Sequence, residues 1–127
     1  MHVDRPVVAV VAIGGAAGAA ARFGLDTAFP GIWTTFAINV VGCLAIGVLV
    51  ELVTAARRPW PLARPLLGTG FLGGFTTFST YANQTRALVH DGQLAVAASY
   101  AGATLVCALA ATWLGMALAR VAQRGNR

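Results

Sequence analysis

Charged residues are scarce in this chain of 127 residues, and lysine is absent. Only 10% of the residues are charged, with nine arginines against four acids, whereas soluble domains carry about 25%. The arginines stand at the ends of apolar stretches, where positive charge is typical of the cytoplasmic edge of a membrane protein. This placement argues against a nucleic-acid-binding surface. No linker is long enough to hold a separate soluble domain, so we expect a single membrane domain over residues 1–127.

Acidic residues are absent from the middle of every apolar stretch, because all four fall at termini, in loops or at span ends. An acidic residue inside a membrane helix usually marks a proton-coupled carrier. Its absence disfavours a proton-coupled exporter of the small four-span type. The sequence also lacks paired carboxylates, a cluster of metal ligands and a nucleophile near a histidine and an acid, so we do not expect an enzyme.

Cysteine is limited to Cys43 and Cys107, and both lie inside apolar stretches. Buried thiols of this kind behave as small hydrophobic side chains. We therefore expect neither a disulfide nor a metal site from them.

Apolar residues make up 57% of the chain and gather in four stretches. A spanning helix needs about 20 mostly apolar residues, and the predicted spans cover residues 7–23, 33–53, 66–88 and 94–120. The sequence thus predicts an all-α, multi-pass protein of the cell membrane with four transmembrane helices. A cleavable signal peptide is an alternative for the first stretch, because small residues follow its apolar run. Three more spans come after it instead of a secreted domain.

The third stretch contains the most unusual segment, residues 70–81, with the sequence G-F-L-G-G-F-T-T-F-S-T-Y. The glycine pair at 73 and 74 loosens a helix, and the hydroxyls that follow offer the backbone alternative hydrogen bonds. Irregular backbone at membrane depth persists only where protein buries it or where it lines a wet cavity. We therefore predict a break near residues 73–77, at mid-membrane, with a transport or coordination role. A non-transporting scaffold is the alternative, although simple packing does not require so many polar groups.

Polar side chains also occur inside two other spans. Asn39 lies within the second, where an amide usually faces protein or a water-filled cavity. An interhelical hydrogen bond that only holds helices together is the alternative. Tyr100 and Thr104 are four residues apart and share a helix face, which predicts a polar track. A single buried hydroxyl can instead bond only to its own preceding turn.

These side chains favour a small anion as the guest. Asn39 presents amide N–H groups, and serine and threonine present rotating hydroxyls. Aromatic rings add positively polarised edges. No lysine or arginine is expected in the membrane interior, so an anion would be bound weakly enough to leave again. Conduction requires binding that is strong enough for entry and weak enough for release.

Three segments together resemble the small bacterial fluoride channel family (Fluc, also called CrcB). Residues 14–23, G-G-A-A-G-A-A-A-R-F, are similar to its G-G-x-x-G-A-x-x-R-[YF] motif. Residues 38–42 with Gly47 resemble V-N-x-x-G-x-F-x-x-G, and residues 70–81 resemble G-F-x-G-G-x-T-T-F-S-T-F. The match covers the whole chain in length, order and number of spans, and the third motif is highly specific.

The resemblance implies a passive channel that exports cytoplasmic fluoride and confers fluoride resistance, built as an antiparallel dimer with two pores. It implies pore-lining roles for the amide, aromatic and hydroxyl side chains of Asn39, Phe78, Tyr81, Thr77, Ser79, Thr80, Tyr100 and Thr104. It further implies that Arg22 lies in a vestibule. The backbone carbonyls of Gly73 and Thr76 would hold a structural sodium ion at the dimer interface.

Some positions depart from the family pattern. Tyr81 stands where Phe is usual, which adds a hydroxyl to a ring expected to act through its edge and leaves its role open. Thr34 and Leu44 replace a usual Gly and Phe, and Thr104 replaces Ser but keeps a hydroxyl.

The arginines predict the orientation of the chain. With four spans, both termini and the loop between the second and third spans share a side that holds Arg5, Arg57, Arg58, Arg64, Arg120, Arg124 and Arg127. Only Arg22 and Arg86 lie on the other side, so we expect the termini in the cytoplasm. Because a homodimer of antiparallel subunits requires a chain with little bias, this asymmetry favours an oppositely oriented paralogue as partner, and a homodimer is the alternative.

Overall fold

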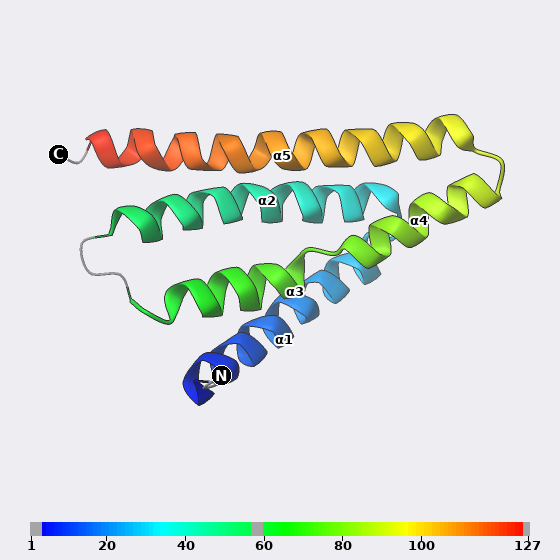
Figure 1. Cartoon of the computed structure of the whole chain (residues 1–127). Coiled ribbons are helices and arrows are strands. Elements are labelled where there is room, and N and C mark those ends of the chain that lie inside the picture. The colour runs from blue at the N-terminus through cyan, green and yellow to red at the C-terminus, as the bar shows by residue number, and fades with distance from the viewer. Residues whose placement is uncertain (1–3, 57–59, 126–127) are drawn as a thin grey trace.

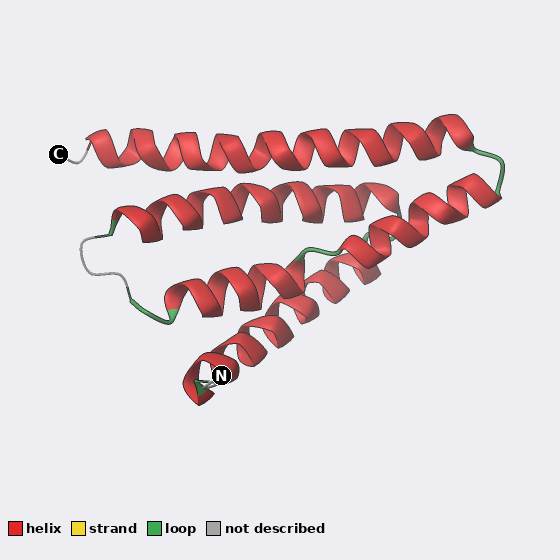
Figure 2. Ribbon diagram, in the orientation of Figure 1, coloured by secondary structure: helices red, strands yellow, loops and turns green. Residues whose placement is uncertain are grey.

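The computed structural model describes residues 4–56 and 60–125, and within this part the chain is helical and contains no strand (Figure 2). The helices are α1 (Arg5–Ala28), α2 (Ile32–Ala55), the π-helix η1 (Arg64–Leu72), the short α3 (Gly73–Phe75), α4 (Phe78–His90) and α5 (Leu94–Gly125). The predicted all-helical fold is therefore confirmed. Arg57, Arg58 and Arg127, which enter the argument on orientation, lie outside the described residues.

Three of these helices, α1, α2 and α5, are long and apolar enough to cross a membrane. Three such helices indicate a multi-pass membrane protein. The remaining stretch that was expected to span is divided between η1, α3 and α4, none of which is long enough alone. A fourth crossing made from these pieces stays a prediction.

The chain alternates in direction along α1, α2, the stretch formed by η1, α3 and α4, and finally α5 (Figure 1). The start of α1, the end of α2, the start of η1 and the end of α5 lie at one end of the bundle, and the α1–α2 and α4–α5 connections lie at the opposite end. α2 packs along α5, while α1 packs along η1 and α3, and α4 contacts α5. The bundle therefore consists of two closely packed helix pairs, with α4 reaching from one pair to the other.

α1 is longer than the first predicted span. The span was expected to end at Phe23, but the helix continues through Gly24 to Ala28. A glycine inside a helix weakens it by about 1 kcal/mol without ending it, and a Cβ at Gly24 would meet nothing within 4 Å. The helix ends before Pro30, because the residue preceding a proline is disfavoured in the helical conformation.

Glycines hold α1 against the η1–α3 segment. A Cβ added at Gly14 would collide with the Leu66 carbonyl, and one at Gly18 would collide with the Phe71 carbonyl. The pair of α2 and α5 is joined in the same way by glycines on both helices. Small residues allow membrane helices to approach until their backbones touch. Gly14 and Gly18 therefore form the face of α1 that packs against this segment.

The third stretch is interrupted at Thr76 and Thr77, inside the predicted range. Both residues are extended, with φ −76° and ψ 156° at the first and φ −145° and ψ 122° at the second. The Thr77 hydroxyl accepts a hydrogen bond from the Thr80 N–H at 3.1 Å, which caps the first turn of α4. Gly73, in contrast, stays helical, with φ −65° and ψ −35°. The hydroxyl residues therefore end the helix, and the expectation that the glycine pair loosens it is wrong.

The glycine pair instead serves packing. A Cβ at Gly74 would collide with the carbonyl of Gly15 on α1. The preceding η1 is a π-helix, a form that usually occurs as a single widened turn and often near functional sites. Nothing in the sequence pattern indicated it.

Candidate functional site

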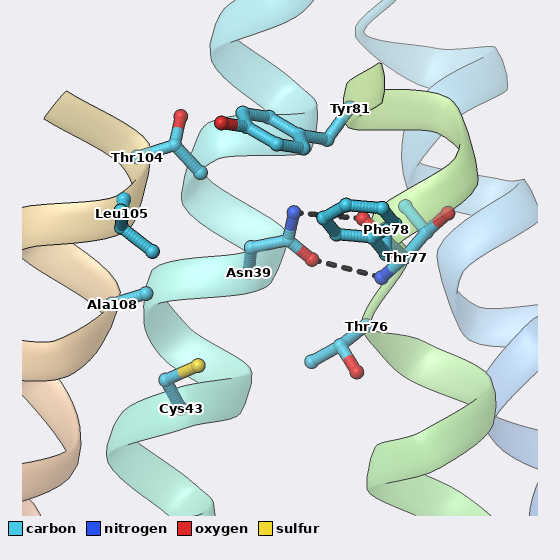
Figure 3. A pocket seen from close by; sticks show the side chains of 9 residues that line it. All are labelled: Asn39, Cys43, Thr76, Thr77, Phe78, Tyr81, Thr104, Leu105 and Ala108. Atoms are coloured by element: carbon cyan, nitrogen blue, oxygen red, sulfur yellow. Dashed lines mark hydrogen bonds between the residues drawn. The ribbon is translucent and has the colours of Figure 1, made fainter. Parts of the chain in front are cut away.

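Asn39 of α2 clamps the interruption. Its amide nitrogen donates to the Thr77 carbonyl at 3.0 Å, and its amide oxygen accepts from the Thr77 N–H at 2.8 Å (Figure 3). The bond to Asn39 Oδ1 satisfies the Thr77 N–H, which would otherwise be unpaired in an apolar interior, whereas the Thr77 carbonyl, at the N-cap of α4, also accepts the first hydrogen bond of that helix. Asn39 is only 8% exposed. The interhelical hydrogen bond considered as an alternative for Asn39 is therefore observed.

The same amide also borders a cavity of about 410 Å³. Its lining combines amide, hydroxyl, aromatic and aliphatic groups from Asn39, Cys43, Thr76, Thr77, Phe78, Tyr81, Thr104, Leu105 and Ala108. A carboxamide nitrogen carries two N–H groups, and only one is used in the bond to Thr77. Asn39 can therefore hold the break and still offer an N–H to a guest.

Five of the eight residues predicted to line a pore meet at this cavity: Asn39, Thr77, Phe78, Tyr81 and Thr104. Figure 3 shows that they come from α2, α4, α5 and the interruption itself. Segments far apart in the sequence thus converge on one space. The Phe78 ring is 80% exposed, so this wall of the cavity faces away from the rest of the chain.

Ser79 and Thr80 do not line this cavity. The Thr77 hydroxyl lies 3.3 Å from the Ser79 hydroxyl and donates to the Thr80 hydroxyl at 3.1 Å. The three side chains form a local network at the start of α4. Their observed contacts stabilise the turn that follows the break.

Tyr81 and Tyr100 are joined by their rings, whose centroids lie 5.6 Å apart. The Tyr81 hydroxyl donates to the Ala101 carbonyl at 3.1 Å, so the group that distinguishes it from Phe is anchored to α5. Its ring lies 5.7 Å from that of Phe78. Tyr100 is buried behind it, does not line the cavity, and donates to the Gln84 side-chain oxygen at 2.7 Å.

Sequence reasoning missed Thr35, Gln84 and Cys43. Thr35 is fully buried, and its hydroxyl, like that of Thr104, has no hydrogen-bond partner among the described residues. The sequence could have indicated Thr35, because it precedes Asn39 by four residues and therefore lies on the same helix face. Gln84 accepts a hydrogen bond from Tyr100 of α5, a pairing that residue spacing does not predict.

Arg22 contacts α3, the helix that precedes the interruption. Its Nε donates to the Gly74 carbonyl at 3.2 Å, and one of its terminal nitrogens lies 3.9 Å from the Asp26 carboxylate. Arg22 does not line the cavity described above. A vestibule position for this side chain stays a prediction.

The carbonyl end of α3 is chemically suited to a cation. Because α3 ends at Phe75, the carbonyls of its last turn lack intrahelical donors, and Gly73 and Thr76 belong to this region. Hard cations take oxygen ligands, including backbone carbonyls. No group of three or more His, Cys, Asp or Glu that could hold a metal occurs within residues 4–56 and 60–125. Backbone carbonyls are ligands of the kind that a sodium ion takes, and the sodium site itself stays a prediction.

Comparison with known proteins finds one matching family model and several similar proteins that carry the same kind of name. Residues 9–116 match the model of the family described as CrcB-like protein, Camphor Resistance (CrcB). The chain is 51% identical to a fluoride-specific ion channel FluC 1 of Streptomyces coelicolor, over 92% of this chain and 79% of the relative. It is 53% identical to a FluC 1 of Rhodococcus jostii, over 86% and 82%, and 48% identical to a FluC 2 of Thermobifida fusca, over 94% and 96%. The chain therefore belongs to the CrcB family.

Proposed function

We propose that this chain forms a fluoride-specific ion channel, the function for which its relatives are named. The observation that carries the proposal is the interruption at Thr76 and Thr77, which Asn39 binds through two hydrogen bonds. Asn39, fixed by both backbone groups of Thr77, shares one cavity with the rings of Phe78 and Tyr81. A dehydrated halide meets there an amide N–H and the positive edges of aromatic rings. The described lining contains no charged side chain, so the ion can leave as well as enter.

The channel is passive and needs no coupled ion. Fluoride enters a cell as the neutral weak acid and is trapped when it ionises in a less acidic cytoplasm. A membrane potential supplies about 2.3 kcal/mol per charge per 100 mV, which drives the anion outward. Export of cytoplasmic fluoride in this way confers resistance to it.

The proposed pore has two kinds of wall. One is the lining of the cavity described above, and the other consists of the remaining predicted residues, Ser79, Thr80 and Tyr100. Thr104 joins the two, because it borders the cavity and lies one helical turn from Tyr100. Its buried hydroxyl has no partner among the described residues, which supports a role in ion contact. In this proposal Arg22 lies in the vestibule of the pore.

A second subunit completes the pore in this proposal. The 80% exposure of Phe78 supports an antiparallel dimer in which each ring faces the partner chain. The carbonyls of Gly73 and Thr76 would bind sodium at the centre of this dimer. The ion would supply structural positive charge between two carbonyl ends and would take no part in conduction.

The termini are proposed to face the cytoplasm, and the partner is an oppositely oriented paralogue. Among the described residues, Arg5, Arg64, Arg120 and Arg124 support this, because all lie in segments at the end of the bundle that holds the start of α1 and the end of α5 (Figure 1). The test is expression of this chain alone. Robust fluoride efflux without a second gene would contradict the paralogue and favour the homodimer.

The channel function is tested in liposomes that contain the purified channel and are loaded with fluoride. A fluoride electrode should record rapid efflux once a potassium ionophore balances the charge, and chloride-loaded vesicles should release little. Proton flux is followed with a pH dye. Efflux that requires a proton gradient would indicate a coupled exporter, and no efflux from correctly assembled protein would indicate a scaffold.

Replacing Asn39 with leucine is expected to lower efflux at least about tenfold, because the buried Thr77 N–H loses its partner at a cost of about 1–3 kcal/mol. The matched control is Thr54→Val in the same helix, whose hydroxyl donates only to its own preceding turn at the Val50 carbonyl. Efflux of the control should stay within about twofold of the parent, since surface substitutions away from such networks change stability little. Parental efflux in Asn39→Leu would show that the clamp is dispensable.

A further inference from the structure

The C-terminal end of α3 needs a hydrogen-bond donor. The chain leaves the helical conformation at Thr76, so the last carbonyls have no N–H one turn ahead to accept from. Thr77, which is bound by Asn39, lies beyond these carbonyls at the N-cap of α4. The Gly74 carbonyl accepts instead from Nε of Arg22, at 3.2 Å, across 52 positions of sequence.

Glycine packing brings Arg22 to this place. Gly18 lies against the backbone of Phe71, and Gly15 lies against Gly74. Arg22 follows Gly18 by four residues and so shares its helix face. The close approach of α1 to α3 therefore delivers a donor to the end of α3. Basic side chains at a helix C-terminus commonly bond the last carbonyls and oppose the negative end of the helix dipole.

Asp26 is the weaker partner of Arg22. The nearest nitrogen–oxygen distance is 3.9 Å, and the two side chains are 27% and 32% exposed. Ion pairs at such exposure contribute little to stability. The directed bond from Nε to Gly74 is shorter and joins two elements, so it dominates the position of this side chain.

From this geometry we infer that Arg22 is a positioning residue: its Nε–H caps the Gly74 carbonyl and thereby fixes the interruption that presents Thr77 and Phe78 to the cavity. The position requires the donor at Nε more than it requires the positive charge. The inference on conduction rests on the proposed fluoride function, whereas the inference on the cap does not.

Three substitutions separate the donor from the charge. In Arg22→Gln the amide nitrogen is bonded to Cδ, as Nε is in arginine, so the donor is kept and the charge is lost. Arg22→Met keeps the apolar stem and loses both. Arg22→Lys keeps the charge but moves it beyond Nε. Asp26→Asn is the control for the ion pair.

The first measurement is hydrogen–deuterium exchange of the purified protein in detergent, read on peptides that cover residues 73–80. In Arg22→Met the amides of the interruption should exchange about tenfold faster, because local opening becomes easier when a cap is lost. Arg22→Gln and Asp26→Asn should stay within about threefold of the parent, on the same reasoning. Equal exchange in Arg22→Met and the parent would overturn the cap, whether or not the protein conducts fluoride.

The second measurement is fluoride efflux from liposomes. Arg22→Gln should retain most of the efflux, Arg22→Met should lose at least about tenfold, and Arg22→Lys should lie between them. The opposite order, with Arg22→Lys retained and Arg22→Gln as poor as Arg22→Met, would assign Arg22 to charge attraction and overturn the positioning role. If the parent itself releases no fluoride, the proposed function fails and the exchange data alone decide the cap.

Discussion

Replacing Phe78 with isoleucine should reduce fluoride efflux to the level of protein-free liposomes. The ring forms part of the cavity wall beside Asn39 and Tyr81, and its edge carries partial positive charge that an aliphatic side chain cannot offer. An anion stripped of water at this point would lose a contact that nothing else replaces. The measurement is electrode-recorded efflux at equal protein density.

The structure also predicts that this loss is not a folding defect. Phe78 is 80% exposed and packs little against its own chain, so the substitution removes few intrachain contacts. Phe23→Ile is the control, because this ring is 72% exposed on α1 and does not line the cavity. Both variants should elute from gel filtration like the parent. Parental efflux from Phe78→Ile would exclude the ring from conduction.

Replacing Gly115 with alanine should destabilise the protein by about 1–3 kcal/mol, the usual cost of overpacking. A Cβ at this position would collide with the Leu44 carbonyl of α2 and would lie 3.0 Å from the Val48 nitrogen. Backbone atoms cannot rotate away as a side chain can. The substitution must therefore push α2 and α5 apart, and thermal unfolding in detergent should report the loss.

Gly102→Ala in the same helix provides the matched control. A Cβ there would meet nothing within 4 Å. Alanine stabilises a helix interior relative to glycine by about 0.5–1 kcal/mol, so this variant should unfold at the same temperature as the parent or above it. Equal shifts in unfolding temperature at the two positions would show that helix propensity, and not backbone contact between α2 and α5, determines the stability change.

Much of the fold could be predicted from residue type and spacing. Apolar stretches and the absence of charge fixed the helical membrane class, and the hydroxyl cluster located the interruption to within a few residues. The sequence misassigned its cause, because Gly73 remains helical while Thr76 and Thr77 leave the helix. Glycine propensity is a local property, and here close packing against Gly15 outweighs it.

The candidate site was less predictable. Asn39 was expected to line a pore, and its pairing with both backbone groups of Thr77 depends on α2 meeting the break. Tyr100 was expected in the same lining as Thr104, and its hydrogen bond to Gln84 is a contact that spacing alone did not predict. Spacing shows which side chains share a face. It does not show what that face meets.

By itself the sequence determined which segments are helical and where the third one is interrupted. These follow from local chemistry, since hydrogen bonds within a helix and transfer from water depend on nearby residues alone. The tertiary structure decided that Asn39 and Arg22 serve the two sides of the interruption, on Thr77 and Gly74. Those pairings join residues 38 and 52 positions apart, and they exist because glycine contacts bring α1 within reach of α3 and the fold sets α2 beside the break.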